Sequence, residues 1–168
     1  DTRNNMAYAW MYGCAKMGMH FVGWGPKELS PAEDVIAYCN EVAKDTGAVL
    51  EFGEDLALLK GADVIYTDIW VSMGEEAKLA ERVKQLAPYK VTSKVMAATE
   101  NPKCLFMHCL PAYHDFETLT AQHCKEEGYD IREVDDDVFR SKQSVVFDEA
   151  ENRMHTIKAV MVATLGNQ

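Results

Sequence analysis

Short apolar runs alternate with helix-type segments along the whole chain, and this alternation limits the folds open to it. We expect strands at residues 20–24, 48–52, 63–68, 104–109 and 144–147. We expect helices at residues 4–17, 55–60, 76–86, 92–98, 117–127 and 151–165, and one more between Ser30 and Gly47. Strands that alternate with helices predict an α/β fold, a doubly wound parallel sheet of the Rossmann-like three-layer α/β/α type.

Local signals set several of these boundaries. Ser30, Pro31 and Glu33 have the spacing of an N-cap, a first helical proline and a capping-box glutamate. Gly47 is expected to end the helix that they open. The acidic run at residues 135–137 is interpreted as a solvated turn or a helix start rather than a metal site.

Polar motifs follow two of the expected strands. Asp68 opens the segment Asp-Ile-Trp-Val-Ser-Met-Gly, and Cys109 belongs to the segment His-Cys-Leu-Pro. In open α/β sheets, ligands bind at the carboxyl ends of the strands. We therefore expect Asp68 and Cys109 to lie close together, where a carboxylate and a thiol can hold and deprotonate an amine.

Composition narrows the class of protein. A chain of 168 residues with 48% apolar content suits one globular domain. Its net charge of −10 argues against nucleic acid and anionic membrane surfaces as partners. Five cysteines without paired spacing favour a reducing compartment, so a cytoplasmic location is expected. No apolar stretch is long enough for a membrane-spanning helix, and no signal peptide is recognised.

Four motifs in this order resemble the ornithine carbamoyltransferase family, within the aspartate/ornithine carbamoyltransferase superfamily. They are Asp-Thr-Arg-Asn-Asn at 1–5, Asp-x-x-x-Ser-Met-Gly at 68–74, His-Cys-Leu-Pro at 108–111 and Phe-Asp-Glu-Ala-Glu-Asn-Arg-Met-His at 147–155. The resemblance implies that residues 1–168 are the second, ornithine-binding half of such an enzyme and lack the first strand of the family domain. It also implies that the final helix, 151–165, packs on a carbamoyl phosphate domain, whose Ser-x-Arg-Thr segment is absent from this sequence.

The resemblance also assigns roles to individual residues. It implies that ornithine is held by Asn5, Asp68, Ser72 and Met73. It implies that carbamoyl phosphate contacts His108, Cys109, Leu110 and Arg153. Cys109 and Asp68 are the expected catalytic pair. A side-chain ammonium has a pKa of about 10.4 and a thiol one of about 8.5, so a cysteine beside positive charge could receive the proton of the amine.

The implied reaction transfers the carbamoyl group of carbamoyl phosphate to the side-chain amine of L-ornithine, and it yields L-citrulline and phosphate. No cofactor or metal is expected, the full-length family forms trimers, and this chain alone is expected to be inactive. Two alternatives stay open. One is an amino-acid-binding domain without catalysis, and the other is a carbamoyltransferase that acts on a different amine such as putrescine.

The same residues also have purely structural interpretations. Without its motif, Cys109 would be a buried small apolar residue and Asp68 the N-cap of a helix. His108 would be a hydrogen-bonded core histidine, and Arg153 a surface residue. Cysteines and histidines between 104 and 124 lack the spacing of a zinc site, and the glycines form no dinucleotide-binding motif.

Overall fold

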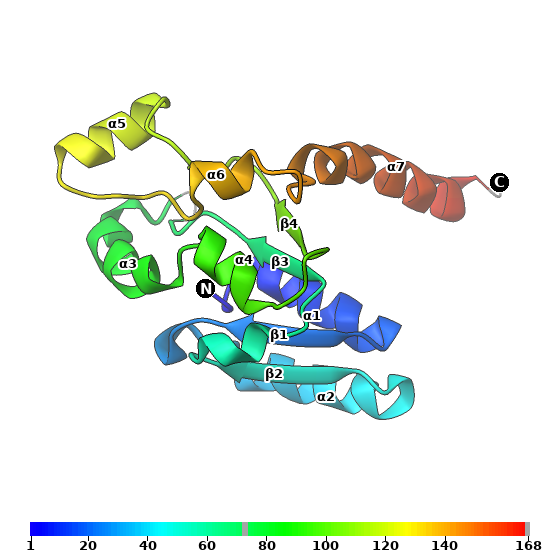
Figure 1. The fold of residues 1–168 in the computed structure, drawn as a ribbon. Coiled ribbons are helices and arrows are strands. Elements are labelled where there is room, and N and C mark those ends of the chain that lie inside the picture. The colour runs from blue at the N-terminus through cyan, green and yellow to red at the C-terminus, as the bar shows by residue number, and fades with distance from the viewer. Residues whose placement is uncertain (72–73, 167–168) are drawn as a thin grey trace.

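The computed structural model describes residues 1–71 and 74–166 as an alternation of strands and helices (Figure 1). The strands are β1 (His20–Trp24), β2 (Val49–Gly53), β3 (Val64–Thr67) and β4 (Leu105–His108). The helices are α1 (Asn5–Met17), α2 (Glu33–Thr46), α3 (Leu79–Leu86), α4 (Ser93–Ala98), α5 (Leu119–Glu126), α6 (Asp136–Phe139) and α7 (Val146–Leu165). Short 3-10 turns occur at η1 (Lys27–Leu29), η2 (Leu56–Leu59), η3 (Glu76–Lys78) and η4 (Ala87–Tyr89). The expected α/β alternation is confirmed.

The strands form two parallel pairs, β1 with β2 and β3 with β4. In the described part of the chain, no ladder joins β1 to β3. The Val49 amide bonds the Met19 carbonyl, and the Gly25 amide bonds the Gly53 carbonyl. Because backbone groups alternate between the two edges of a parallel strand, the amides of Val22 and Trp24 face away from β2. The outer edge of β1 is therefore open to another strand.

Packing shows that the two pairs belong to one layer. On one face, α1 covers both pairs: Met11 belongs to a core cluster with Phe21 of β1, while Trp10 packs edge-on against Tyr66 of β3 at 5.2 Å between ring centroids. On the other face, Val22 packs into the core cluster that contains Ile65 of β3. One strand between β1 and β3 would complete a doubly wound sheet whose first strand is central. That the family domain has one further strand there stays a prediction.

Two sequence predictions about local structure are wrong. Ser30 does not cap α2, because its backbone is extended where it closes η1, and its carbonyl accepts a hydrogen bond from Nε of Arg3 at 2.8 Å. The helix instead begins at Glu33, after Ala32, without a side-chain cap. Residues 144–147 form no strand, since Ser144 makes only an isolated bridge to Phe106 and α7 begins at Val146.

Other helix signals are confirmed. The Asn4 side chain accepts a hydrogen bond from the Ala7 amide at 2.7 Å and caps α1. Gly47 ends α2 with φ of +77°, a conformation that favours glycine. Asp135 is the N-cap residue of α6, so the acidic run at 135–137 is a helix start. Within the described ranges, no helix combines the length and apolar composition needed to cross a bilayer.

The last helix extends away from the other elements (Figure 1). Val146 is its buried residue, and every described residue from 150 onward is exposed. Its apolar side chains have exposed fractions between 49% and 64% at Met154, Ile157, Val160, Met161 and Leu165. That this helix packs on a carbamoyl phosphate domain stays a prediction. Its exposed apolar side chains support the prediction, because such a patch is typical of an interaction surface.

We predict that this chain, taken alone, self-associates through α7. Burial of a large apolar side chain contributes about 1.5–3 kcal/mol, so a stripe of such residues suffices for association. Sedimentation velocity over a range of concentrations should show oligomers. The double substitution Ile157→Asp with Met161→Asp should abolish them, whereas Thr156→Asp, a change beside the stripe, should not. A chain that stays monomeric at every concentration would contradict this prediction.

Candidate functional site

The Asp68–Cys109 pair lies at the carboxyl ends of β3 and β4. Parallel pairing places Thr67 opposite His108, so the next residue of each strand reaches the same edge. The Cys109 thiol donates a hydrogen bond to Oδ1 of Asp68 over 3.0 Å. The contact that the sequence predicts is therefore present. Asp68 caps no helix; the same oxygen accepts the Ile69 amide at 2.7 Å.

The protonation state of Cys109 differs from expectation. For Cys109 to accept a proton, nearby positive charge was expected to lower the pKa of its thiol. Instead, burial and the adjacent Asp68 carboxylate raise the pKa of Cys109 to about 12, although the Tyr66 hydroxyl acts in the opposite direction. Cys109 is thus a neutral thiol at pH 7, because its ionised form would face a carboxylate in a partly desolvated place.

His108 is fully buried behind the loop that follows β4. Its Nδ1 accepts a hydrogen bond from the Leu110 amide at 3.0 Å. Because a backbone amide can only donate, Nε2 carries the proton and donates to Oε1 of Glu133 at 3.0 Å. Both ring nitrogens of His108 are therefore used within the chain, and its implied contact with carbamoyl phosphate stays a prediction.

Glu133 is a site residue that the sequence analysis missed. Its side chain is fully buried, and Oε1 accepts both Nε2 of His108 and the Tyr113 amide, the latter at 2.6 Å. Burial raises the pKa of this carboxyl, which the His108 and Tyr113 hydrogen bonds partly offset. The sequence offered only a weak indication that Glu133 is buried. It lies between Ile131 and Val134, both buried, but the acidic run at 135–137 follows directly and suggests an exposed segment. Glu133 thus holds the loop after β4 at its start, through His108, and again at Tyr113.

The loop itself has an unusual backbone. Leu110 has φ of +51°, and the Leu110–Pro111 peptide is cis. A positive φ costs a residue such as leucine about 1–3 kcal/mol, and it persists only where the surrounding structure imposes it. Here the hydrogen bond from the Leu110 amide to the His108 ring, itself held by Glu133, stabilises that conformation. The carbonyl groups of Cys109 and Leu110 are thus fixed relative to Asp68.

Among the described residues, neither Asn5 nor Arg153 makes a side-chain hydrogen bond to Asp68 or Cys109, so their predicted roles stay predictions. Asn5 is the first residue of α1 and is exposed. Arg153 is exposed on α7, and in the described part of the chain its side chain makes no ion pair or hydrogen bond. Ser72 and Met73 lie outside the described residues, so their predicted contacts with ornithine stay predictions.

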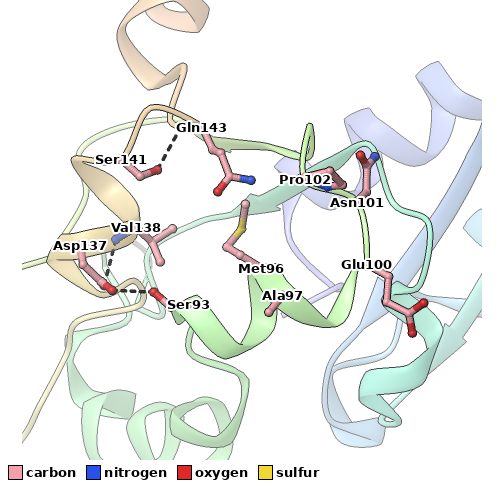
Figure 2. Close-up of a pocket in the computed structure, with 10 residues that line it drawn as sticks. All are labelled: Ser93, Met96, Ala97, Glu100, Asn101, Pro102, Asp137, Val138, Ser141 and Gln143. Carbon is pink, nitrogen blue, oxygen red and sulfur yellow. Dashed lines mark hydrogen bonds between the residues drawn. The ribbon is translucent and has the colours of Figure 1, made fainter.

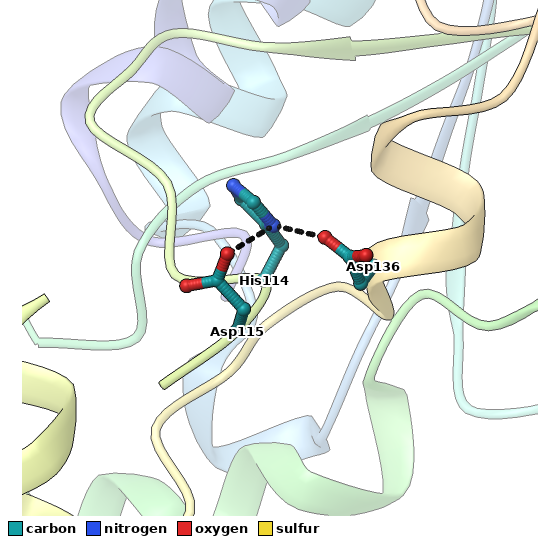
Figure 3. Close-up of side chains that lie close together, drawn as sticks. All are labelled: His114, Asp115 and Asp136. Atoms are coloured by element: carbon teal, nitrogen blue, oxygen red, sulfur yellow. Dashed lines mark hydrogen bonds and ion pairs between the residues drawn. The ribbon is translucent and has the colours of Figure 1, made fainter. Parts of the chain in front are cut away.

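A separate cluster joins His114, Asp115 and Asp136 (Figure 3). Nδ1 of His114 lies 2.6 Å from Oδ1 of Asp136 and 3.4 Å from Oδ2 of Asp115. The Arg140 guanidinium also reaches these carboxylates, at 2.8 Å and 3.3 Å respectively. A metal ion would have to displace this arginine, so the donor set does not favour one. That the chain binds no metal stays a prediction.

A surface hollow of about 470 Å³ lies between α4 and α6 (Figure 2). It is lined by Ser93, Met96, Ala97, Glu100, Asn101, Pro102, Asp137, Val138, Ser141 and Gln143. Ser93 and Asp137 hydrogen-bond to each other over 2.5 Å. None of the predicted site residues lines this hollow, so it is not the site formed by Asp68 and Cys109.

Comparison with known proteins shows the family of this chain. The family model for the aspartate/ornithine carbamoyltransferase Asp/Orn binding domain matches residues 1–164. The chain belongs to this family. It is 63% identical to a catabolic ornithine carbamoyltransferase of Clostridium perfringens and 52% identical to one of Staphylococcus epidermidis, in each case over 99% of this chain and 51% of the relative. The chain thus spans about half the length of the curated relatives it matches.

Solved structures of ornithine carbamoyltransferases have the same fold. That of the anabolic enzyme from Campylobacter jejuni superposes with a TM-score of 0.82 at 30% identity, over 98% of this chain and 49% of that one. That of the Pyrococcus furiosus enzyme gives a TM-score of 0.79 at 36% identity, over 96% and 47%. The Rossmann-like α/β class expected from the sequence is confirmed.

We predict that Asp68 suppresses the reactivity of Cys109. In the native chain at pH 8, iodoacetamide should alkylate Cys109 slowly because little thiolate is present. Asp68→Asn removes the adjacent negative charge and should increase the rate by about tenfold, as a fall of one pKa unit would. Peptide mass spectrometry measures the rate at Cys109, with the buried Cys39 and Cys104 as internal controls. An unchanged rate in the variant would refute the assignment.

We predict that Glu133 makes the chain less stable as the pH rises. Its pKa in the folded state lies above the ordinary value, so the folded state binds the proton more tightly than the unfolded state does. The free energy of unfolding then falls with rising pH above about 4.5, by at most about 1.4 kcal/mol per pH unit from this one group. Urea titrations at several pH values should show a shallower slope in Glu133→Gln, but not in Glu126→Gln, where the carboxylate is exposed. Equal slopes in both variants would contradict the prediction.

Proposed function

We propose that this chain is the ornithine-binding half of an ornithine carbamoyltransferase. Joined to a carbamoyl phosphate-binding half, it would transfer the carbamoyl group of carbamoyl phosphate to the side-chain amine of L-ornithine and release L-citrulline and phosphate. The observation that carries this proposal is the contact between Cys109 and Asp68 at neighbouring strand ends, in a chain of this family.

Ornithine recognition needs an acceptor for ammonium groups and donors for the α-carboxylate. Asp68 supplies a carboxylate at the strand edge, and Asn5 supplies an exposed amide at the start of α1. Burial and the Asp68 carboxylate together raise the pKa of Cys109, and an ammonium that arrives beside Asp68 offsets the contribution of that carboxylate. The bound substrate thereby makes it easier for the Cys109 thiol to release its proton to solvent, and the resulting thiolate can accept the proton that the amine loses as it attacks.

Carbamoyl transfer begins when the neutral amine nitrogen attacks the carbamoyl carbon. A new C–N bond forms, the C–O bond to phosphate breaks, and the amine loses one proton. The carbonyl groups of Cys109 and Leu110 are suited to accept hydrogen bonds from the carbamoyl nitrogen, because the loop that carries them is held by His108 and Glu133. Fixed acceptors of this kind orient the reacting group without reorganisation during the reaction.

The other half of the protein would supply the phosphate contacts. We infer that Arg153 joins them once α7 packs on that half, since α7 now leaves its apolar side chains and Arg153 in solvent. We also infer a homo-oligomer, a trimer as in the full-length family, that works in the cytoplasm in arginine metabolism. Free cysteines throughout the described ranges support a reducing compartment.

We predict that transfer requires both halves and the Cys109 thiol. The full-length protein should form citrulline from ornithine and carbamoyl phosphate, and residues 1–168 alone should form none above background. In the full-length protein, Cys109→Ala should lower kcat by about 100-fold or more, the usual contribution of a proton-transfer group. The kcat of Cys124→Ala, a change outside the Asp68–Cys109 pair, should stay near that of the unmodified protein. Full activity of the isolated chain would refute the two-half proposal.

The substrate is tested by calorimetric titration with ornithine, norvaline and putrescine. An ornithine site should bind the two amino acids more tightly than putrescine, because putrescine offers no carboxylate to Asn5. Tighter binding of putrescine would identify the alternative amine. Amino-acid binding by a full-length protein without citrulline formation would identify a binding domain without catalysis.

A further inference from the structure

The backbone groups on the outer edge of β4, the edge that faces away from β3, have unusual hydrogen-bond partners. Leu105 donates its amide to the Asp63 carbonyl, so the odd-numbered residues of β4 bond β3. Phe106 therefore uses the opposite edge: its amide bonds the Gln143 carbonyl at 2.8 Å, and its carbonyl accepts the Val145 amide at 3.0 Å. Up to this point, the segment before α7 behaves as a short neighbouring strand.

At His108, the next position on this edge of β4, a side chain takes over the role of the neighbouring strand. The next amide on the outer edge belongs to His108, and it donates to Oε2 of Glu149 at 3.0 Å. No backbone carbonyl of the segment before α7 accepts this amide, because the chain has already turned into α7. There the Glu149 amide bonds the Val145 carbonyl at 2.9 Å. The Glu149 carboxylate thus occupies the position of a ladder carbonyl and links the end of β4 to the first turn of α7.

The hydrogen bond between His108 and Glu149 lies between two parts of the chain that the proposed reaction needs. On one side, the His108 amide directly precedes Cys109, whose carbonyl is part of the loop that faces Asp68. On the other side, Arg153 lies four residues beyond Glu149, about one helical turn or 6 Å along the axis. A hydrogen bond to an ionised carboxylate is shorter and stronger than a neutral one, and Glu149 is half-buried.

We propose that Glu149 is a positioning residue, which fixes the Cys109–Leu110 loop relative to α7 and so to Arg153. The inference rests on the proposed function, because the spacing matters only if loop and helix act on the same substrate. Glu149 acts on the backbone of His108, whereas Glu133 holds the ring of the same residue. The two carboxylates therefore restrain the loop through different atoms. Burial raises the pKa of Glu149, while the His108 amide opposes this shift, in agreement with a carboxylate held in a partly desolvated place.

The test compares three variants of the full-length protein. Glu149→Ala removes the acceptor and leaves the His108 amide without a partner. Glu149→Gln keeps an amide oxygen in the same place. Asp148→Ala is the matched control, since Asp148 is exposed and is the other acidic residue in the first turn of α7. Any general effect of charge at the start of the helix is shared by Asp148 and Glu149.

The expected result is a loss of kcat of at least about tenfold in Glu149→Ala, with a higher KM for carbamoyl phosphate and a KM for ornithine within about twofold of the unmodified protein. Glu149→Gln should recover most of the rate, and Asp148→Ala should keep it. Amide hydrogen exchange supplies a second readout. Exchange at His108 should accelerate in Glu149→Ala, while Phe106, bonded to Gln143, should stay protected.

The outcomes separate this inference from the proposed function. If the unmodified protein forms no citrulline, the proposed function is wrong, and the positioning role fails with it. If the unmodified protein is active and Glu149→Ala keeps its kcat, only the positioning role is overturned. Unchanged exchange at His108 in Glu149→Ala would likewise overturn it, because the hydrogen bond would then not restrain the loop.

Discussion

The parallel register of β3 on β4 is the constraint on which the site depends. It sets Thr67 opposite His108, and therefore Asp68 and Cys109, which are 41 residues apart in sequence, meet over 3.0 Å. A slip of one residue would turn every side chain of a strand to the other face and separate the pair. The buried side chains of Ile65 and Phe106 oppose such a slip, because they pair in this register within the core.

The end of β4 is restrained on each side. β3 occupies one edge, the segment before α7 and then the Glu149 carboxylate occupy the other, and the His108 ring reaches back to Glu133. These contacts allow Leu110 to hold a positive φ, a conformation that leucine rarely adopts alone. A rigid loop beside a strand end is a suitable place to present backbone carbonyl groups to a substrate, since the protein need not reorganise when the substrate binds.

Much of the architecture follows from local patterns. The strands at residues 20–24, 48–52, 63–68 and 104–109 and the major helices were predictable, because apolar periodicity and end signals such as Gly47 act over a few residues. The errors occur where distant contacts override those signals. Ser30 bonds Arg3 across 27 residues instead of capping a helix, and residues 144–145 reach β4 only long enough for one bridge before α7 begins.

The sequence by itself determined the α/β class, the family and the pair of residue types, a carboxylate and a thiol, that follow adjacent strands. Only the tertiary structure decided the protonation state of Cys109 and the contacts that hold the loop around it. The pKa of Cys109 depends on burial and on Asp68, and the loop depends on Glu133 and Glu149, partners 25 and 41 residues away from His108. Desolvation and hydrogen bonding act through space, so their effect is defined only when the chain has folded.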